Sequence, residues 1–338
     1  MDFSFSLYPD SLPAFLACVE RAEELGAAGI WVDDSGLKRD PYVLLTLASE
    51  HSRRISLGTC TTNPLSRHLG VTARAIASLH EASGGRAVLG LGRGEGSLKP
   101  LGMRQVSPPE LGEAALLLRR LLSGETVDGD QRRAAFRFSN AKLAFFKSQE
   151  KSARVPVFIA ATGPEMLNVA GRTADGVIVS VGPDPKAIKY ALEQIREGAA
   201  DAGRDFTSLK VMVFLFTSIS KDREQARSYA RPKALWFLEH APYLVSLLDV
   251  EDSTFKRTLG SAPTTTKGKG LSELLSSGLE LGKIVSDQAV DAFTVAGDEE
   301  ECAQKINRIK QDCGMEHAIF SIRENWEYAA SAVARSAH

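Results

Sequence analysis

Residues 55–96 contain a strand–helix–strand pattern that restricts the chain to one class of fold. Two short apolar runs, Ile55–Gly58 and Ala87–Leu91, have the composition of buried strands. Between them, alanine and isoleucine recur at helical spacing over Val71–Leu79. Parallel strands need a crossover of this kind, and their sheet is normally covered by helices on both faces. We therefore expect an α/β protein with a parallel sheet.

The same rhythm recurs along most of the chain. Each apolar run is followed by a helical pattern, which gives eight strand–helix pairs, and right-handed crossovers close such a series into a (β/α)8 TIM barrel. An open doubly wound sheet is the alternative, but it needs a glycine-rich turn after the first strand, and residues 8–11 contain no glycine. The remaining predicted strands are Phe3–Tyr8, Gly29–Val32, Val155–Ala160, Gly176–Ser180, Leu209–Phe216 and His317–Ile322.

Two segments interrupt this rhythm. Residues 123–154, after the fourth strand, are polar and contain one alternating piece at 135–138, which predicts a hairpin. Residues 218–291, after the seventh strand, are largely helical in pattern, with a flexible loop at 263–270. We interpret both as insertions that shape a ligand pocket, within a single domain that spans residues 1–338.

Composition excludes several classes of function. The 338 residues are 43% hydrophobic, which is enough for a large core, and the net charge of -1 without a dense basic run argues against nucleic-acid binding. We find no signal peptide and no apolar run long enough to span a bilayer, and the dispersed histidines predict no metal site. The four cysteines are scattered along the chain, which indicates reduced thiols and predicts a cytoplasmic protein. They are Cys18, Cys60, Cys302 and Cys313.

Barrels of this class bind ligands at the carboxyl ends of their strands. The small and polar residues at these ends are therefore the candidates for a site. They are Asp33, Asp34, Ser35, Cys60, Thr61, Thr62, Asn63, Gly92, Arg93, Gly94, Glu95, Ala161, Thr162, Gly163, Ser180, Val181 and Gly182.

Three of these positions carry a specific chemical hypothesis. Residues 162–164 lead into a helix N-terminus, whose free N–H groups and dipole favour an anion such as phosphate; an ordinary tight turn is the alternative. Glu95 lies in a glycine-rich loop that would admit a flat ligand, where it would handle a proton or a hydrogen bond; a solvated loop is the alternative. Cys60 is either a reactive thiol or a small apolar filler.

Four motifs together resemble the bacterial luciferase-like superfamily, and within it the methylenetetrahydromethanopterin reductase group. They are Thr-Asn-Pro-x-Ser-Arg-His at 62–68, Ser-Gly-Gly-Arg-Ala at 83–87, Gly-Leu-Gly-Arg-Gly-Glu at 90–95 and Ala-Asp-Gly-Val at 174–177. The resemblance covers residues 1–122, 155–216 and 293–322. It implies the luciferase-like type of (β/α)8 barrel, with the ring of coenzyme F-420 or of FMN over the barrel mouth.

The resemblance also assigns roles to the candidates. It implies a cis peptide bond at Cys60–Thr61 that backs the ring, and it makes Glu95 a proton-transfer residue. Several members carry an acid–base histidine where this chain has Ser35, whereas Asp34 keeps the position of an acidic partner. The implied cofactor-binding residues are Cys60, Thr61, Thr62 and Asn63 along the ring, Gly92 and Arg93 beside it, and Ala161, Thr162, Gly163, Ser180, Val181 and Gly182 around the phosphate-bearing tail.

Three functions fit these observations. The first is an oxidoreductase that moves a hydride between F-420 and a small organic substrate. The second is a monooxygenase that uses oxygen and reduced FMN. The third is a barrel that only binds a ligand. We expect a homodimer, and for the first two functions a flavin or F-420 reductase as the source of reduced cofactor.

Overall fold

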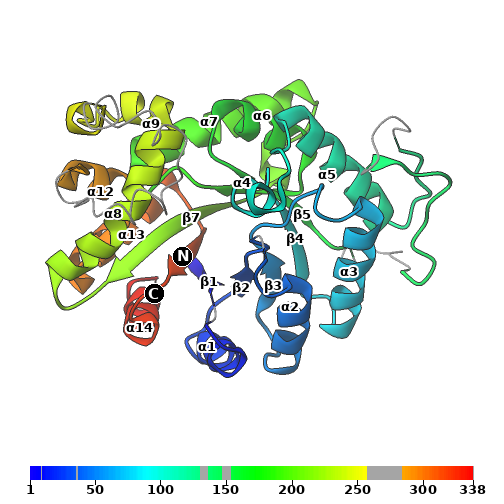
Figure 1. The fold of residues 1–338 in the computed structure, drawn as a ribbon, viewed down its shortest axis with the longest axis horizontal. Coiled ribbons are helices and arrows are strands. Elements are labelled where there is room, and N and C mark those ends of the chain that lie inside the picture. Colours follow the sequence, from blue (N-terminus) through cyan, green and yellow to red (C-terminus); the bar gives the residue numbers. More distant parts are fainter. Residues whose placement is uncertain (9, 36, 130–135, 147–153, 257–283, 338) are drawn as a thin grey trace. The chain divides into compact units, whose positions relative to one another are not determined.

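The computed structural model describes residues 1–8, 10–35, 37–129, 136–146, 154–256 and 284–337 (Figure 1). The chain divides into two compact units. We call Asp2–Val179 with Leu192–Met212 the N-terminal unit, and Met1, Ser180–Ala191 and Val213–His338 the C-terminal unit. The single domain expected from the sequence stays a prediction.

The N-terminal unit is built on six parallel strands, and each strand pairs with the next one in the sequence. Every residue of the second, fourth and sixth strands is buried, as a parallel sheet covered on both faces requires. The strands are β1 (Asp2–Leu7), β2 (Gly29–Val32), β3 (Ser56–Thr59), β4 (Ala87–Leu91), β5 (Val157–Ala161) and β6 (Gly176–Val179).

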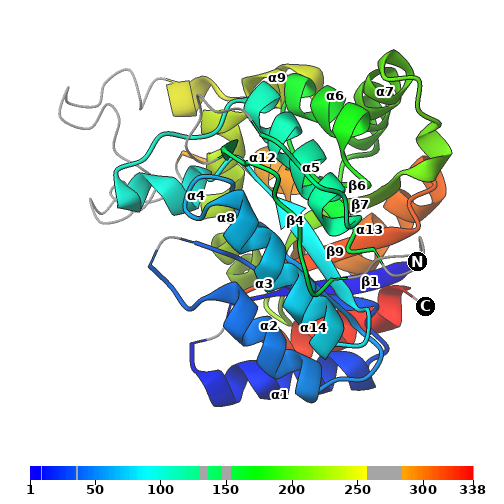
Figure 2. The ribbon, with the colours of Figure 1, turned by 90° about the vertical axis from the view of Figure 1, so that its right-hand side faces the viewer.

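Helices connect these strands, and several neighbouring helices contact one another. Figure 2 shows the first three of them side by side. They are α1 (Leu12–Glu24), α2 (Pro41–Glu50), α3 (Leu69–Ala82), α4 (Glu95–Leu98), α5 (Pro108–Leu122), α6 (Pro164–Thr173) and α7 (Pro185–Asp201), with 3-10 turns η1 (Lys99–Leu101) and η4 (Phe206–Ser208). The last helix, α7, begins in the C-terminal unit.

Local capping explains where several of these helices begin. The Ser11 hydroxyl accepts a hydrogen bond from the backbone N–H of Ala14 and so caps α1. Asp40 accepts from the N–H groups of Tyr42 and Val43 at the start of α2. A capping box between Ser107 and Glu110 begins α5.

The C-terminal unit contains most of a long strand, β7 (Lys210–Ile219), which begins in the N-terminal unit and enters the C-terminal unit at Val213. This strand has a parallel neighbour on each side. One neighbour is β9 (His317–Ile322), the predicted eighth strand. The other is β8 (Val295–Gly297), which pairs with the last three residues of β7 and is not among the eight predicted strands. The helices are α8 (Arg223–His240), α9 (Pro242–Leu247), α12 (Asp287–Phe293), α13 (Glu299–Cys313) and α14 (Trp326–Ala337).

The two predicted insertions fall partly outside the described residues. In the first, Val127 and Ala141 form an isolated antiparallel bridge, while the alternating piece expected at 135–138 is described only from residue 136. In the second, α8, α9 and α12 confirm the helical pattern, and the predicted loop at 263–270 lies outside the described ranges. Among the helices that the structure describes, none is both long and apolar enough to cross a membrane.

The loop before β4 holds the amino ends of the strands together through Arg86. Its guanidinium donates to the backbone oxygens of Ser49 at 3.0 Å, Ser52 at 3.1 Å and Ile55 at 2.9 Å. Because the amino-terminal face of a barrel serves stability rather than ligand binding, we assign Arg86 a structural role.

Replacing Arg86 tests this assignment. Arg86→Met leaves three carbonyl groups without their charged donor, so we expect the free energy of unfolding to fall by about 2–4 kcal/mol. The measurement is urea denaturation followed by circular dichroism. The matched control is Arg74→Met on the exposed face of α3, and an equal loss in both variants would contradict the assignment.

Candidate functional site

Asp34, in the loop after β2, accepts hydrogen bonds from two residues that follow β3. The Thr62 hydroxyl donates to Asp34 Oδ2 at 2.6 Å, and the Arg67 guanidinium donates to the same oxygen. The Asp34 and Arg67 side chains are only 13% and 22% exposed, so water screens this ion pair weakly. Asp34 is therefore held in place by the neighbouring loop.

Arg67 connects this loop to α2 as well. Its second guanidinium nitrogen donates to the carboxylate of Asp40, the residue that caps α2. The guanidinium also lies 5.2 Å from the centroid of the Tyr42 ring. Burial raises the pKa of the Tyr42 hydroxyl above its usual range, although the guanidinium charge opposes this shift, so the phenol stays neutral.

The peptide bond between Cys60 and Thr61 is cis, at the position that the family resemblance implied. Burial raises the pKa of the Cys60 thiol above its usual range, and the negative charge of Asp33 adds to the shift. Because the thiolate is the reactive form, Cys60 fits the small apolar filler better than the nucleophile.

Asn63 ties the loop after β3 to the loop after β4. Its side-chain oxygen accepts from the N–H groups of Leu65 at 3.0 Å and Ser66 at 2.8 Å. Its amide nitrogen donates to the Ser97 hydroxyl at 3.0 Å, and the residue is only 1% exposed. The amide therefore fixes the shape of both loops.

The glycine-rich segment after β4 leads into a single helical turn, α4, which begins at Glu95. Arg93 before the turn is exposed and Glu95 is half-buried, so the solvated loop stays open as the alternative interpretation. Gly94 precedes the turn with φ at +81°, a conformation that favours glycine. A Cβ atom on Gly92 would lie 2.2 Å from the Thr61 hydroxyl oxygen. The loops after β3 and β4 can therefore approach this closely only because residue 92 has no side chain.

Glu95 begins this turn and is half-buried. A Cβ atom on the next residue, Gly96, would lie 3.9 Å from the hydroxyl oxygen of Ser35. The turn thus lies beside the loop that contains Ser35. Arg93 is anchored on the other side, because its Nε donates to the carbonyl of Val106 at 2.7 Å.

The predicted anion site lies at the start of α6. Gly163 is its N-cap residue, Pro164 follows, and no atom lies within 4 Å of the position that a Cβ on Gly163 would take. Ala161 ends β5, and Thr162 is half-buried beside it. The N-terminus of a ten-residue helix favours an anion through its dipole, and phosphate binding at this one stays a prediction.

Three further candidates, Ser180, Val181 and Gly182, follow β6. They belong to the C-terminal unit, where Val181 and Gly182 are buried, and their place at the cofactor tail stays a prediction. Within the described ranges, His, Cys, Asp and Glu side chains form no group of three that could hold a metal ion.

Sequence reasoning missed two residues that organise the site, Arg67 and Ser97. His68, the neighbour of Arg67, caps α3, since its Nδ1 accepts from the N–H of Gly70 at 3.1 Å, whereas Arg67 binds two carboxylates. The Ser-Arg-His motif at 66–68 was the only signal that singled out this arginine.

Comparison with known proteins gives consistent results. A model of the luciferase-like monooxygenase family matches residues 4–317. The 5,10-methylenetetrahydromethanopterin reductase of Methanolobus tindarius is 35% identical over 292 residues, which cover 85% of this chain and 84% of that protein. The F-420-dependent glucose-6-phosphate dehydrogenase of Nakamurella multipartita is 28% identical over 303 residues, or 86% of this chain and 78% of that protein.

A solved structure extends the comparison to the fold. The coenzyme F-420-dependent tetrahydromethanopterin reductase from Methanopyrus kandleri superposes with a TM-score of 0.82 and 24% sequence identity, over 99% of this chain and 97% of that chain. The likeness confirms the predicted fold class, a closed (β/α)8 barrel of parallel strands with surrounding helices.

The ion pair between Arg67 and Asp34 can be tested by a rescue experiment. Arg67→Met leaves a mostly buried carboxylate without its cation, so we expect the free energy of unfolding to fall by about 1–3 kcal/mol. Adding Asp34→Asn should recover part of that loss, because it removes the stranded charge. Adding Asp40→Asn should recover less, since Asp40 is 42% exposed. Urea denaturation measures all three variants, and equal recovery by both second substitutions would contradict the assignment.

Proposed function

Because the chain belongs to the luciferase-like family, we propose that it is an oxidoreductase that transfers a hydride between coenzyme F-420 and a small organic substrate. The observation that carries the proposal is that neighbouring strands of the N-terminal unit bring two features together. The loops after β2, β3 and β4 form a hydrogen-bonded polar rim, and the N-terminus of α6, with Gly163 as its N-cap residue, follows β5. A flat ring with an anionic tail matches such a pair of features.

The residues of the rim suit a deazaflavin ring. The neutral Cys60 thiol offers a small contact without charge, and the buried Asn63 amide fixes the backbone around it. Gly163 and Thr162 would hold the phosphate of the tail at the start of α6, where the helix dipole favours an anion. When bound, F-420 supplies the hydride chemistry, while the protein binds, orients and shields the reacting atoms.

Two carboxylates of this chain take different roles in the proposal. Asp34 Oδ2 already accepts hydrogen bonds from Thr62 and Arg67, which suits a residue that positions the substrate or the ring. Glu95 begins a short helical turn beside Ser35 and is half-buried, which suits a residue that moves a proton. Glu95 would thus take over the task of the missing family histidine.

The proposal also concerns the choice of cofactor, the assembly of the enzyme and its location. Two of the similar proteins are named as dependent on F-420, which favours it over FMN as the cofactor. A homodimer, a cytoplasmic location and a partner reductase that regenerates reduced cofactor remain expectations from the sequence.

Cofactor choice is tested by titrating the purified full-length protein with F-420 and with FMN. We expect F-420 to bind at least about tenfold more tightly, a difference of about 1.4 kcal/mol. Quenching of cofactor fluorescence gives both dissociation constants. FMN binding that is tighter than F-420 binding would reverse the assignment and favour the monooxygenase.

The role of Glu95 is tested by Glu95→Gln. We expect turnover to fall by about a hundredfold or more, because general acid–base catalysis contributes on this scale, with the dissociation constant for F-420 unchanged. The assay follows F-420 absorbance with methylenetetrahydromethanopterin and glucose 6-phosphate, the substrates named in the similar proteins. Glu81→Gln, on the exposed face of α3, is the control. Full activity of Glu95→Gln would remove the glutamate from the mechanism.

A further inference from the structure

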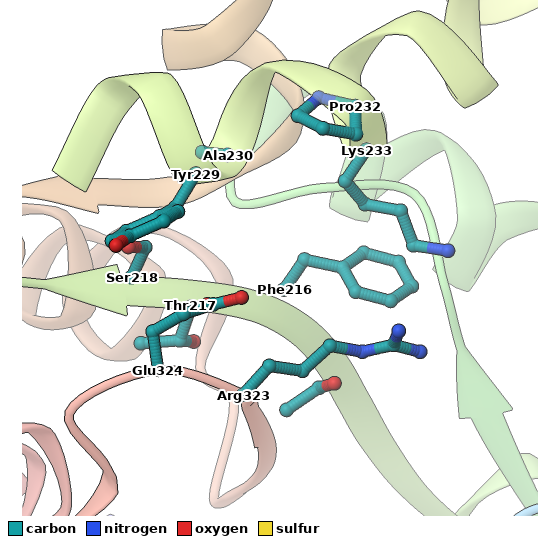
Figure 3. Close-up of a pocket in the computed structure, with 10 residues that line it drawn as sticks. Phe216, Thr217, Ser218, Tyr229, Ala230, Pro232, Lys233, Arg323 and Glu324 are labelled. Carbon is teal, nitrogen blue, oxygen red and sulfur yellow. The ribbon is translucent and has the colours of Figure 1, made fainter. Parts of the chain in front are cut away.

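The C-terminal unit contains a cavity of about 220 Å³ near the carboxyl ends of β7 and β9 (Figure 3). Phe216 and Ser218 of β7 line it from the sheet, together with Ser321 of β9. Tyr229 and Lys233 of α8 line another side. Because barrels bind ligands at the carboxyl ends of their strands, this position is one at which a small molecule is expected.

Two cationic side chains from different segments contribute to the wall of this cavity. Lys233 comes from α8, and Arg323 follows the end of β9. Figure 3 shows their charged ends directed to the same side of the cavity, with the Phe216 ring between them in the view. The Lys233 ammonium lies 3.8 Å from the centroid of that ring, so a cation–π contact helps to hold it there.

One acidic side chain, Glu324, accompanies the two cations. Burial raises the pKa of Glu324 above its usual range, although the Arg323 guanidinium opposes the shift. An acid with a raised pKa in a cavity is a recurrent feature of functional sites. With two positive groups and one acid, the wall of the cavity carries a surplus of positive charge.

We propose that this cavity binds the oxyanion group, a carboxylate or a phosphate, of the small organic substrate, with Lys233 and Arg323 as its charged contacts. A guanidinium presents two parallel donors that match a carboxylate or phosphate, and an ammonium adds a mobile point charge. The Phe216 and Tyr229 rings supply flat apolar surface, so a planar organic acid fits better than a bare ion. The assignment of the oxyanion to the substrate rests on the proposed function, whereas binding of the oxyanion does not.

The test uses two probes of the same shape, benzoate and benzamide, on the full-length protein without cofactor in a buffer free of phosphate. We expect isothermal titration calorimetry to show that benzoate binds at least about tenfold more tightly than benzamide, because hydrogen bonds between charged groups are stronger than those of a neutral amide. Lys233→Met and Arg323→Gln should each remove most of this preference and leave benzamide binding unchanged.

Two control variants separate the cavity from the net charge of the protein. Lys310→Met and Arg308→Gln each remove one exposed cation of α13 in the same unit, and both should keep the preference for benzoate. Equal binding of the two probes by the unmodified protein would overturn the proposal. An equal loss of preference in the controls would overturn it as well.

A second titration identifies the source of the oxyanion. F-420 should bind Lys233→Met and Arg323→Gln as tightly as it binds the unmodified protein. A dissociation constant raised tenfold in these variants would assign the cations to the tail of the cofactor and overturn the assignment to the substrate. Failure of the unmodified protein to bind F-420 at all would reject the proposed function and overturn that assignment too, while the benzoate result would still decide whether the cavity binds an oxyanion.

Discussion

The register between neighbouring parallel strands is the constraint on which the candidate site depends. Val32 pairs with Thr59, and the isolated bridge between Thr62 and Leu91 continues the alignment toward β4. Parallel pairing brings the carboxyl ends of consecutive strands to one edge, so the loops that leave β2, β3 and β4 begin side by side. Every later contact, from Asp34 to Ser97, follows from that alignment.

Packing behind this edge keeps the register fixed. A Cβ atom on Gly58 would lie 2.3 Å from the ring of Trp31, the residue that pairs with it on the next strand. The Trp31 side chain is fully buried and fills the space that the glycine leaves. A slip of one residue would turn every strand side chain to the opposite face, so this pair makes such a slip costly.

The sequence predicted the parts of the fold that follow from local pattern. Seven predicted strands agree with the observed ones to within about two residues at each end, and β7 runs three residues beyond its predicted end. Very short strands and helices were not predicted. The strand β8 has three residues and α4 has four, which is too few for either periodicity to be visible.

Long-range contacts in the site could not be predicted from the sequence for a different reason. Arg67 lies 33 residues from Asp34 and 27 from Asp40, and no local pattern connects residues so far apart. The family motif marked the segment, but it did not say which carboxylates the arginine would bind. Asp34 was a candidate because it follows the end of a strand. That Thr62 and Arg67 donate hydrogen bonds to it became visible only in the structure.

The two units also differ in how many of their functional residues the family resemblance identified. The motifs that indicated a redox cofactor all lie in the N-terminal unit. The cavity in the C-terminal unit takes Tyr229 and Lys233 from α8, within the segment 218–291 where the resemblance is weak. Specificity is a difference between the affinities for competing ligands. An enzyme that keeps its cofactor but changes its substrate therefore keeps the cofactor-binding residues and changes the residues that line the substrate pocket. Lys233 lies on this divergent helix, whereas Arg323 follows β9, so the proposed oxyanion site takes one of its two cations from the segment where the resemblance is weak.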